Sequence, residues 1–127
     1  MVLSFPKRRR LASNRQFKAA LDHGRRVGNS LLTLYMAPNR CGFPRLGVSV
    51  GKSSGQAVVR NRLKRLLREA FRRSQDRIPR EFDYVLMISP SLSRKLKRPE
   101  GGAKALASLN SRQVQESFLS LVEILAH

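Results

Sequence analysis

The residues of this 127-residue sequence with the clearest chemistry are cations at helical spacing. Seven of the sixteen residues in the segment 58–73 are Lys or Arg, and only Glu69 is acidic. At 100° per residue, the polar side chains form one stripe along a helix, which consists of Asn61, Arg65, Arg68 and Arg72 and is flanked by Lys64. Arg outnumbers Lys six to one in this segment, and the planar guanidinium suits bidentate binding of phosphate. The stripe therefore indicates binding to a polyanion.

The opposite stripe of the same segment is apolar. It consists of Val59, Leu63, Leu66 and Ala70, flanked by Leu67. The sequence thus predicts a helix with one side in a core and the other facing polyanions. The alternative is an ordinary solvated face whose arginine stems lie along the core edge. Nucleic-acid binding is favoured because acidic partners are too few for these cations: Arg68 has no acidic residue four positions away, and Arg65 and Arg73 share the single Glu69 at that spacing.

The composition agrees with this interpretation. The net charge is +18, from 26 basic and 8 acidic residues, which is more than solubility requires and attracts polyanions. Nucleic acid is the first expected partner, ahead of acidic membranes and acidic proteins. The N-terminus is apolar and then basic, the reverse of a signal peptide, and no apolar run approaches the roughly 18 residues of a membrane span. We expect one domain in a soluble, cytoplasmic protein.

The residue types of catalytic sites are sparse. The only histidines are His23 and His127, and no two carboxylates are spaced as a general acid and base. Residues 51–53 (Gly-Lys-Ser) end like a phosphate-binding loop, but Leu46 stands where its first glycine belongs. Cys41 is the only cysteine. The sequence predicts no catalytic residue and no intrinsic cofactor, and it leaves open whether the chain binds metal.

Several elements must position the cationic stripe. Residues 1–12 are predicted to form a basic arm. A helix is predicted to begin at Ser13, which forms a capping box with Gln16, and to end at Gly24. Its apolar face consists of Phe17, Ala20 and Leu21. Alternating residues predict strands at 31–36 and 45–51, which we expect to pair as an antiparallel hairpin across the turn at 38–44.

The second half of the chain continues the pattern after the basic helix. An apolar run at 83–89 predicts a strand buried on both faces, so that strand, helix and strand form a crossover. The segment 90–110 is basic and is interrupted by Pro99, Gly101 and Gly102, which predicts a mobile linker. A final helix at 111–126 has an apolar face made of Val114, Phe118, Leu121, Val122 and Leu125.

A long ordered motif resembles one known family. Residues 45–52 and 55–71 resemble the bacterial ribonuclease P protein component, with Arg60-Asn61-Arg62 at that family's Arg-Asn-Arg signature. The likeness begins at Ser13 and extends through the strand at 83–88. The sequence departs from the family pattern at Leu21, where an aromatic residue is frequent, and at Ser53, where a second Lys is frequent.

The resemblance implies an α/β fold of the sandwich-like α+β kind, in which about three helices pack on a small mixed sheet, as in a ribosomal small-subunit protein domain. It also implies a left-handed βαβ crossover, whereas the general rule predicts a right-handed one. In this family the RNA subunit performs catalysis with bound magnesium and removes the 5′ leader of precursor tRNA. The implied partners are that RNA and precursor tRNA, with no membrane and no small-molecule substrate.

The resemblance assigns roles by position. The residues expected to contact the catalytic RNA are Arg60, Asn61, Arg62, Lys64, Arg65 and Arg68, to which the cationic stripe adds Arg72. Those expected to hold the leader are Phe17, Tyr35, Arg45, Ser49 and Lys52. Without the resemblance, core packing is the first interpretation of Phe17 and Tyr35, and base stacking the second. The alternatives to this family are a ribosomal or other structural RNA-binding protein and a membrane-active basic protein.

Overall fold

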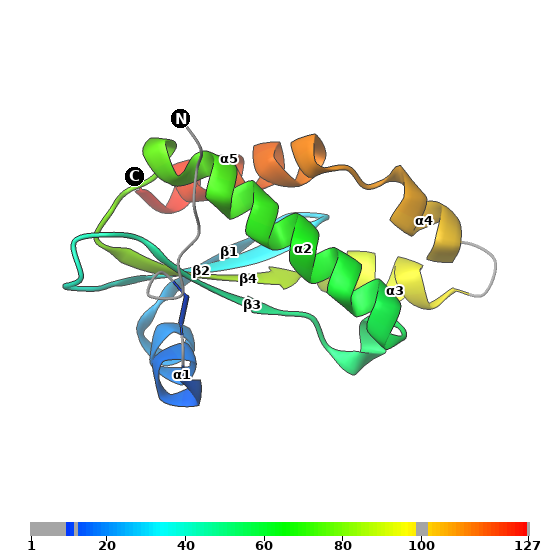
Figure 1. The fold of residues 1–127 in the computed structure, drawn as a ribbon, viewed down its shortest axis with the longest axis horizontal. Coiled ribbons are helices and arrows are strands. Elements are labelled where there is room, and N and C mark those ends of the chain that lie inside the picture. Colours follow the sequence, from blue (N-terminus) through cyan, green and yellow to red (C-terminus); the bar gives the residue numbers. More distant parts are fainter. Residues whose placement is uncertain (1–9, 12, 99–101, 127) are drawn as a thin grey trace.

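The structure is a computed structural model that describes residues 10–11, 13–98 and 102–126 (Figure 1). Its helices are α1 (Asn14–His23), α2 (Ala57–Ser74), α3 (Pro90–Lys97), α4 (Gly102–Ser108) and α5 (Ser111–Ala126). Its strands are β1 (Arg25–Gly28), β2 (Leu32–Pro38), β3 (Arg45–Ser49) and β4 (Phe82–Ile88). Short 3-10 turns, η2 (Lys52–Ser54) and η3 (Gln75–Arg77), flank α2. The mixed α/β fold is confirmed, with more helices than the sequence predicted.

The four strands form one mixed sheet in the order β1-β2-β4-β3. β4 pairs antiparallel with β2 and parallel with β3. The predicted hairpin between the strands at 31–36 and 45–51 is therefore wrong, because β4 lies between them. The reason is burial: four consecutive residues of β4, from Asp83 to Leu86, are buried, and a strand covered on both faces belongs in the interior of a sheet.

β1 is an edge strand that the sequence analysis did not predict. Two of its four residues are arginines, so it lacks an apolar pattern, and charged side chains are typical of sheet edges. It joins β2 through a turn in which the side-chain oxygen of Asn29 accepts hydrogen bonds from the backbone N–H groups of Leu31 and Leu32, each at 2.9 Å. The Gly28-Asn29 pair was the available turn signal.

The crossover from β3 through α2 to β4 is left-handed. In Figure 1 both strands point to the right, α2 lies in front of the sheet, and β4 lies above β3. With the strands turned to point upward, β4 lies to the left of β3, which is the uncommon sense. The resemblance implied this hand, and general principles alone would have predicted the opposite one.

The main core lies between one face of the sheet and the helices α2 and α5. The rings of Phe71 (α2), Tyr84 (β4) and Phe118 (α5) are fully buried, with centroids 5.8, 5.9 and 6.2 Å apart. The predicted apolar face of α5 is buried throughout. On α2 the buried residues are Leu63, Leu67, Ala70, Phe71 and Ser74, whereas Val59 and Leu66 are only partly buried. Packing therefore fixes which side of α2 faces outward.

A second, smaller core lies on the other face of the sheet, beneath α1. Ala20 of α1 packs with Ala37 and Val85, and Phe17 and Leu21 border this cluster. The N-cap prediction is confirmed, since the Ser13 hydroxyl oxygen accepts a hydrogen bond from the Gln16 backbone N–H at 3.2 Å. Gly24 ends the helix in an extended conformation, where a Cβ atom would lie 2.3 Å from the Ala20 carbonyl oxygen.

The segment 90–110 was predicted to be a linker, but it contains α3 and α4. The Ser89 hydroxyl oxygen accepts a hydrogen bond from the Leu92 backbone N–H at 3.0 Å, and Pro90 occupies the first turn of α3. Proline ends a strand but is also favoured at the first position of a helix, and the prediction considered only the first role. Residues 99–101 lie outside the described part, as does most of the predicted arm at 1–12. Of that arm, Leu11 donates its backbone N–H to the Leu46 carbonyl at 2.9 Å.

Candidate RNA-binding surfaces

Most of the predicted RNA-contacting residues lie on the outward side of α2. Asn61, Arg62 and Arg65 are exposed. The partly buried members are Arg60, Lys64, Arg68 and Arg72. Asn61, Arg65, Arg68 and Arg72 share one side of the helix, as in the predicted stripe, whereas Arg60 stands seven residues before the buried Leu67 and lies on the core-facing side.

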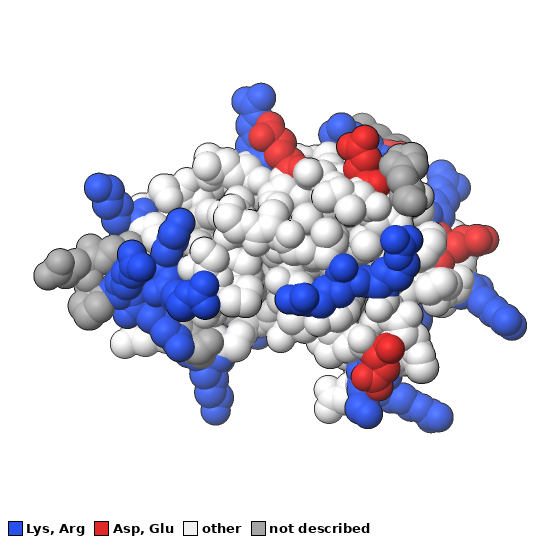
Figure 2. All heavy atoms as spheres, turned by 180° about the vertical axis from the view of Figure 1, so that it is seen from behind, with Lys and Arg blue, Asp and Glu red and all other residues white. Residues whose placement is uncertain are grey.

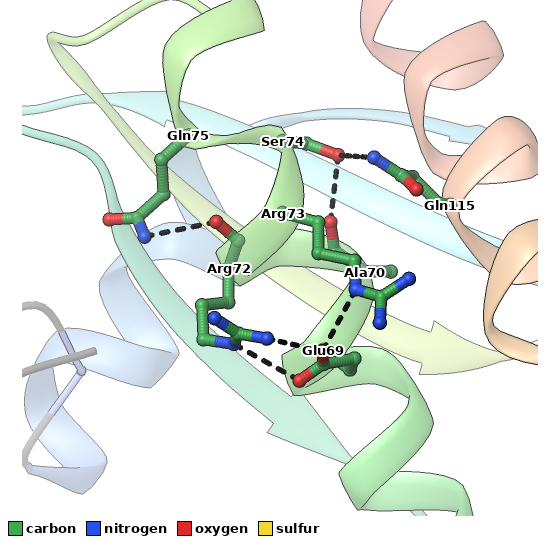
Figure 3. Close-up of polar contacts among 7 residues, drawn as sticks. All are labelled: Glu69, Ala70, Arg72, Arg73, Ser74, Gln75 and Gln115. Carbon is green, nitrogen blue, oxygen red and sulfur yellow. Dashed lines mark hydrogen bonds and ion pairs between the residues drawn. The ribbon is translucent and has the colours of Figure 1, made fainter. Parts of the chain in front are cut away.

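One member of this surface has an acidic partner that the sequence analysis missed. Arg72 donates its Nε–H to Glu69 Oε2 at 3.1 Å and also contacts Glu69 Oε1, and Arg73 Nε donates to the same Oε1 at 2.9 Å (Figure 3). The hydrogen bonds from Arg72, and then those from Arg73, lower the pKa of Glu69, although burial opposes the shift. Glu69 lies three positions before Arg72 and was missed because only residues four positions apart were considered.

A hollow of about 430 Å³ lies on this surface where the end of the arm meets α2. Its lining residues are Arg10, Asn61, Arg65, Arg68, Glu69 and Arg72. Burial lowers the pKa of the Arg68 guanidinium, and the nearby charge of Arg10 lowers it further. Cations from two segments are thus brought together at the hollow, and a phosphate group there would relieve their mutual repulsion.

Arg60 in the first turn of α2 has a polar atom that the protein leaves unsatisfied. Its Nε is buried and has no hydrogen-bond partner among the described residues. A buried donor without a partner costs roughly 1–3 kcal/mol.

The two aromatic residues predicted to stack on the leader share the face of the sheet beneath α1. Tyr35 lies opposite Val85, and Val85 lies opposite Gly47 in the next strand. The Phe17 ring rests on Gly47, where a Cβ atom would lie 2.7 Å from Phe17 Cε2. Both rings are partly buried at the edge of the small core. Phe17 and Tyr35 therefore combine the two interpretations, because each packs on the core and still exposes part of its ring.

Arg45, also predicted to contact the leader, lies on the same face but is bound within the protein. Its Nε and Nη2 donate to the two carboxylate oxygens of Asp83 at 2.7 and 2.8 Å, and Asn39 Nδ2 donates to Asp83 Oδ1 at 2.7 Å. These hydrogen bonds to Asp83 raise the pKa of Arg45, although burial opposes the shift. Since only 17% of its side chain is exposed, Arg45 is placed to hold β3 against β4.

The remaining cleft residues are Ser49, Lys52 and one cation that the sequence analysis missed. Ser49 is partly exposed beside Met87, and Lys52 is exposed in η2. Arg26 of β1 is exposed directly opposite Tyr35, so both side chains lie on one face of the sheet. Arg26 was missed because β1 itself was not predicted. We use the name cleft for the expected leader-binding surface of Phe17, Tyr35, Arg26, Ser49 and Lys52; the Ser53 side chain lies outside the described part.

The described residues hold no cluster of metal-ligating side chains. No three His, Cys, Asp or Glu side chains among them come together as a ligand set. No helix in the described ranges is long and apolar enough to cross a membrane.

The sequence and the structure both resemble those of known ribonuclease P proteins. Residues 5–123 match the Ribonuclease P family model. The chain is 45% identical over 79 residues to the ribonuclease P protein component of Clostridium kluyveri, which covers 62% of this chain and 70% of that one. The structure of the Thermotoga maritima RNase P protein superposes with a TM-score of 0.73 at 30% identity, covering 91% and 96% of the two chains. The Staphylococcus aureus RNase P protein gives 0.69 at 25% identity, covering 91% and 94%. With its basic helix, its left-handed crossover and these matches, the chain belongs to the ribonuclease P protein family.

Proposed function

We propose that this chain is the protein subunit of a ribonuclease P, which binds the catalytic RNA through α2 and the 5′ leader of precursor tRNA through the cleft. The observation that carries the proposal is the placement of the two sets of residues on opposite faces of the sheet. The α2 helix packs on the main core, whereas Phe17 and Tyr35 border the small core on the other face. The two sets meet where Phe17 and Arg68 line one hollow of about 290 Å³ with Arg10. One small protein can then contact two RNAs at once.

The α2 surface suits a folded RNA. Arg62 and Arg65 are exposed, and Arg68 and Arg10 approach each other at the hollow. Closely spaced guanidinium groups bind the crowded phosphates of a compact RNA because each forms two directed hydrogen bonds. Chemistry belongs to the RNA subunit, and the protein contributes binding.

The cleft suits single-stranded RNA. Base stacking on a partly exposed aromatic ring does not depend on sequence, and nearby cations follow the backbone. Phe17 and Tyr35 supply the rings, and Arg26 and Lys52 supply the charge. Leaders of different sequence can therefore bind in the same cleft. Arg45, bound to Asp83, supports the strand beneath it.

Magnesium enters this proposal only through the RNA subunit. The described protein side chains offer no ligand cluster, so we assign no step to a metal on the protein. The protein instead places positive charge where two polyanions approach, and less magnesium is then needed to offset their repulsion. The proposed place of action is the cytoplasm.

The test mixes the purified chain with the catalytic RNA of its host and measures binding of precursor and mature tRNA. We expect the chain to tighten binding of precursor tRNA, to leave mature tRNA unchanged, and to permit cleavage at lower magnesium. Equal effects on the two tRNAs would indicate a structural RNA-binding protein and would contradict the proposal that the cleft binds the leader.

A variant separates the cleft from the α2 surface. Phe17→Leu keeps apolar packing on Gly47 but removes the stacking ring. Loss of one base–aromatic stack should weaken precursor binding by about tenfold, within the usual range of 1–3 kcal/mol per base. Binding of the catalytic RNA alone should not change. If that binding falls as well, Phe17 acts through the fold.

A further inference from the structure

A further group of cations lies on α3 and α4, away from the α2 surface and beyond the cleft. Its exposed members are Arg94, Lys95, Lys97, Arg98 and Lys104. Figure 2 shows Lys and Arg gathered at this end of the molecule, with no Asp or Glu among the residues that the structure describes there. From position 84 to position 115, the described residues include no Asp or Glu. This end therefore attracts polyanions.

The cations of α3 point to two different sides. Arg94 and Lys97 line a groove of about 380 Å³ between α3 and the ends of β3 and β4. Lys95 and Arg98, each one residue further along, line a separate hollow with Lys104 of α4. The spacing of three residues within each pair places its members on the same side of the helix.

The groove continues the cleft. Ser49 belongs to the cleft and also lines the groove, together with Met87, its neighbour across β3 and β4. Met87 also lies opposite Thr33, two residues from Tyr35 on the same face of β2. An RNA single strand whose bases stack on Phe17 and Tyr35 can therefore continue past Ser49. It then reaches Arg94 and Lys97 along the same face of the protein.

The polar wall of the groove is fixed in place. The hydroxyl groups of Ser54 in η2 and Ser93 in α3 lie 3.4 Å apart, in hydrogen-bond range. Ser89 at the start of α3 is buried and donates its hydroxyl to the Ser30 carbonyl at 2.6 Å. These contacts hold α3 against both the loop after β3 and the β1–β2 turn. Arg94 and Lys97 thus extend from a rigid base.

We propose that this groove binds the part of the precursor-tRNA leader that lies beyond the cleft, through phosphate contacts of Arg94 and Lys97. The inference rests on leader binding in the cleft. An RNA single strand is favoured over a duplex because the groove adjoins the aromatic residues of the cleft. Its lining combines small residues (Ser49, Gly51 and Ser93), which let a backbone approach, with the apolar side chains of Met87, Ile88 and Pro90, against which unpaired bases can pack.

The experiment uses holoenzyme assembled with wild-type chain or with Arg94→Gln/Lys97→Gln. Binding is measured for mature tRNA and for precursors with leaders of about 4 and about 16 nucleotides, the range of site sizes for small single-strand-binding domains. The wild type should bind the longer leader more tightly than the shorter one. The variant should bind the precursors with the longer and the shorter leader with equal affinity. Its salt slope for the longer leader should fall by about 0.7 for each lost phosphate contact.

Lys95→Gln/Arg98→Gln is the matched control, because it removes the same charge at the same spacing from the other side of α3. The control should still bind the precursor with the longer leader more tightly than the one with the shorter leader. If the control loses the same affinity, or if the groove variant loses equal affinity for both leaders, the effect is one of general charge and the inference is overturned. The inference is also overturned if the groove variant still binds the longer leader more tightly than the shorter one. If wild-type holoenzyme does not prefer precursor over mature tRNA, leader binding itself fails. If it prefers precursor but ignores leader length, only the groove is wrong.

Discussion

At the scale of single residues, charge alone does not show which cation is available to RNA. Arg45 and Arg72 are both arginines at predicted contact positions, and each is bound to a carboxylate within the protein. Arg65 is exposed on the same helix as Arg72. An arginine that already has an anionic partner adds less counterion release when a phosphate approaches. The predicted contact residues therefore differ in their expected contributions.

The comparison of Arg65 and Arg72 tests this difference. Arg65→Gln should lower the slope of log affinity for the catalytic RNA against log salt by roughly 0.7–0.9, the value of one phosphate contact. Arg72→Gln should lower it by less, because Glu69 already offsets the charge of Arg72. The slopes come from binding titrations at several salt concentrations. Equal decreases would mean that Arg72 leaves Glu69 when RNA binds.

The Glu69 cluster also predicts a dependence of stability on pH. Hydrogen bonds from Arg72 and Arg73 lower the pKa of Glu69 in the folded protein. Its stabilising contribution is therefore fully present above the unfolded pKa of about 4.3 and is lost as the pH falls through the lower folded pKa. Wild type should be more stable than Glu69→Gln at about pH 7, and the difference should shrink by about pH 3.

Chemical denaturation of both proteins across this pH range measures the difference. Glu123→Gln is the matched control, since Glu123 is exposed on α5 and no pairing of its carboxylate is described. A gap that is constant from about pH 7 to about pH 3 would show that the Glu69 carboxylate does not act through its charge.

At the scale of elements, α3 depends on a single serine at its start. The Ser89 hydroxyl accepts from the Leu92 backbone N–H and donates to the Ser30 carbonyl, so it joins the helix to the β1–β2 turn. Pro90 follows at the first turn and Leu92 is buried. These contacts explain why a basic segment that resembles a linker forms a helix here.

Ser89→Ala should lower the free energy of unfolding by about 1–2 kcal/mol, because it removes a helix cap and the hydrogen bond to the Ser30 carbonyl. Ser91→Ala on the same helix should have a much smaller effect, since Ser91 is not the capping residue. Urea denaturation of the two variants measures the difference. Equal effects would show that α3 is held by its packing and not by its cap.

At the scale of the whole molecule, the fold separates two functions by using both faces of one sheet. Main-core packing directs α2 outward on one side, and α1 borders the cleft on the other. A net charge of +18 surrounds both surfaces. Such a charge opposes the compact state and favours RNA binding, so salt should affect the two in opposite directions.

Raising the salt from about 0.01 M to about 0.15 M shortens the Debye length from roughly 30 Å to roughly 8 Å. The midpoint of thermal unfolding of the free chain should therefore rise, while its affinity for the catalytic RNA falls. Calorimetry and binding titrations in matched buffers measure the two effects. A midpoint that does not rise would show that self-repulsion contributes little to the stability of the free chain.

The sequence by itself determined the local features of this protein. Helical periodicity predicted the two-sided helix α2 and the apolar face of α5. A residue pair predicted the cap at Ser13, and an uninterrupted apolar run predicted the strand β4. The Arg-Asn-Arg motif led to the family on the same basis. Each of these features depends on residues that lie close together in the chain.

Only the tertiary structure decided which distant segments meet. Four features join segments that lie far apart in the sequence: the central place of β4 in the sheet, the pairing of Arg45 with Asp83, the position of Arg26 beside Tyr35, and the groove along α3. Local patterns do not encode such contacts, because sheet order depends on which strand gains most from burial on both faces. The sequence thus identified the RNA-binding side of α2, and the packing of the sheet decided which other side chains join the cleft.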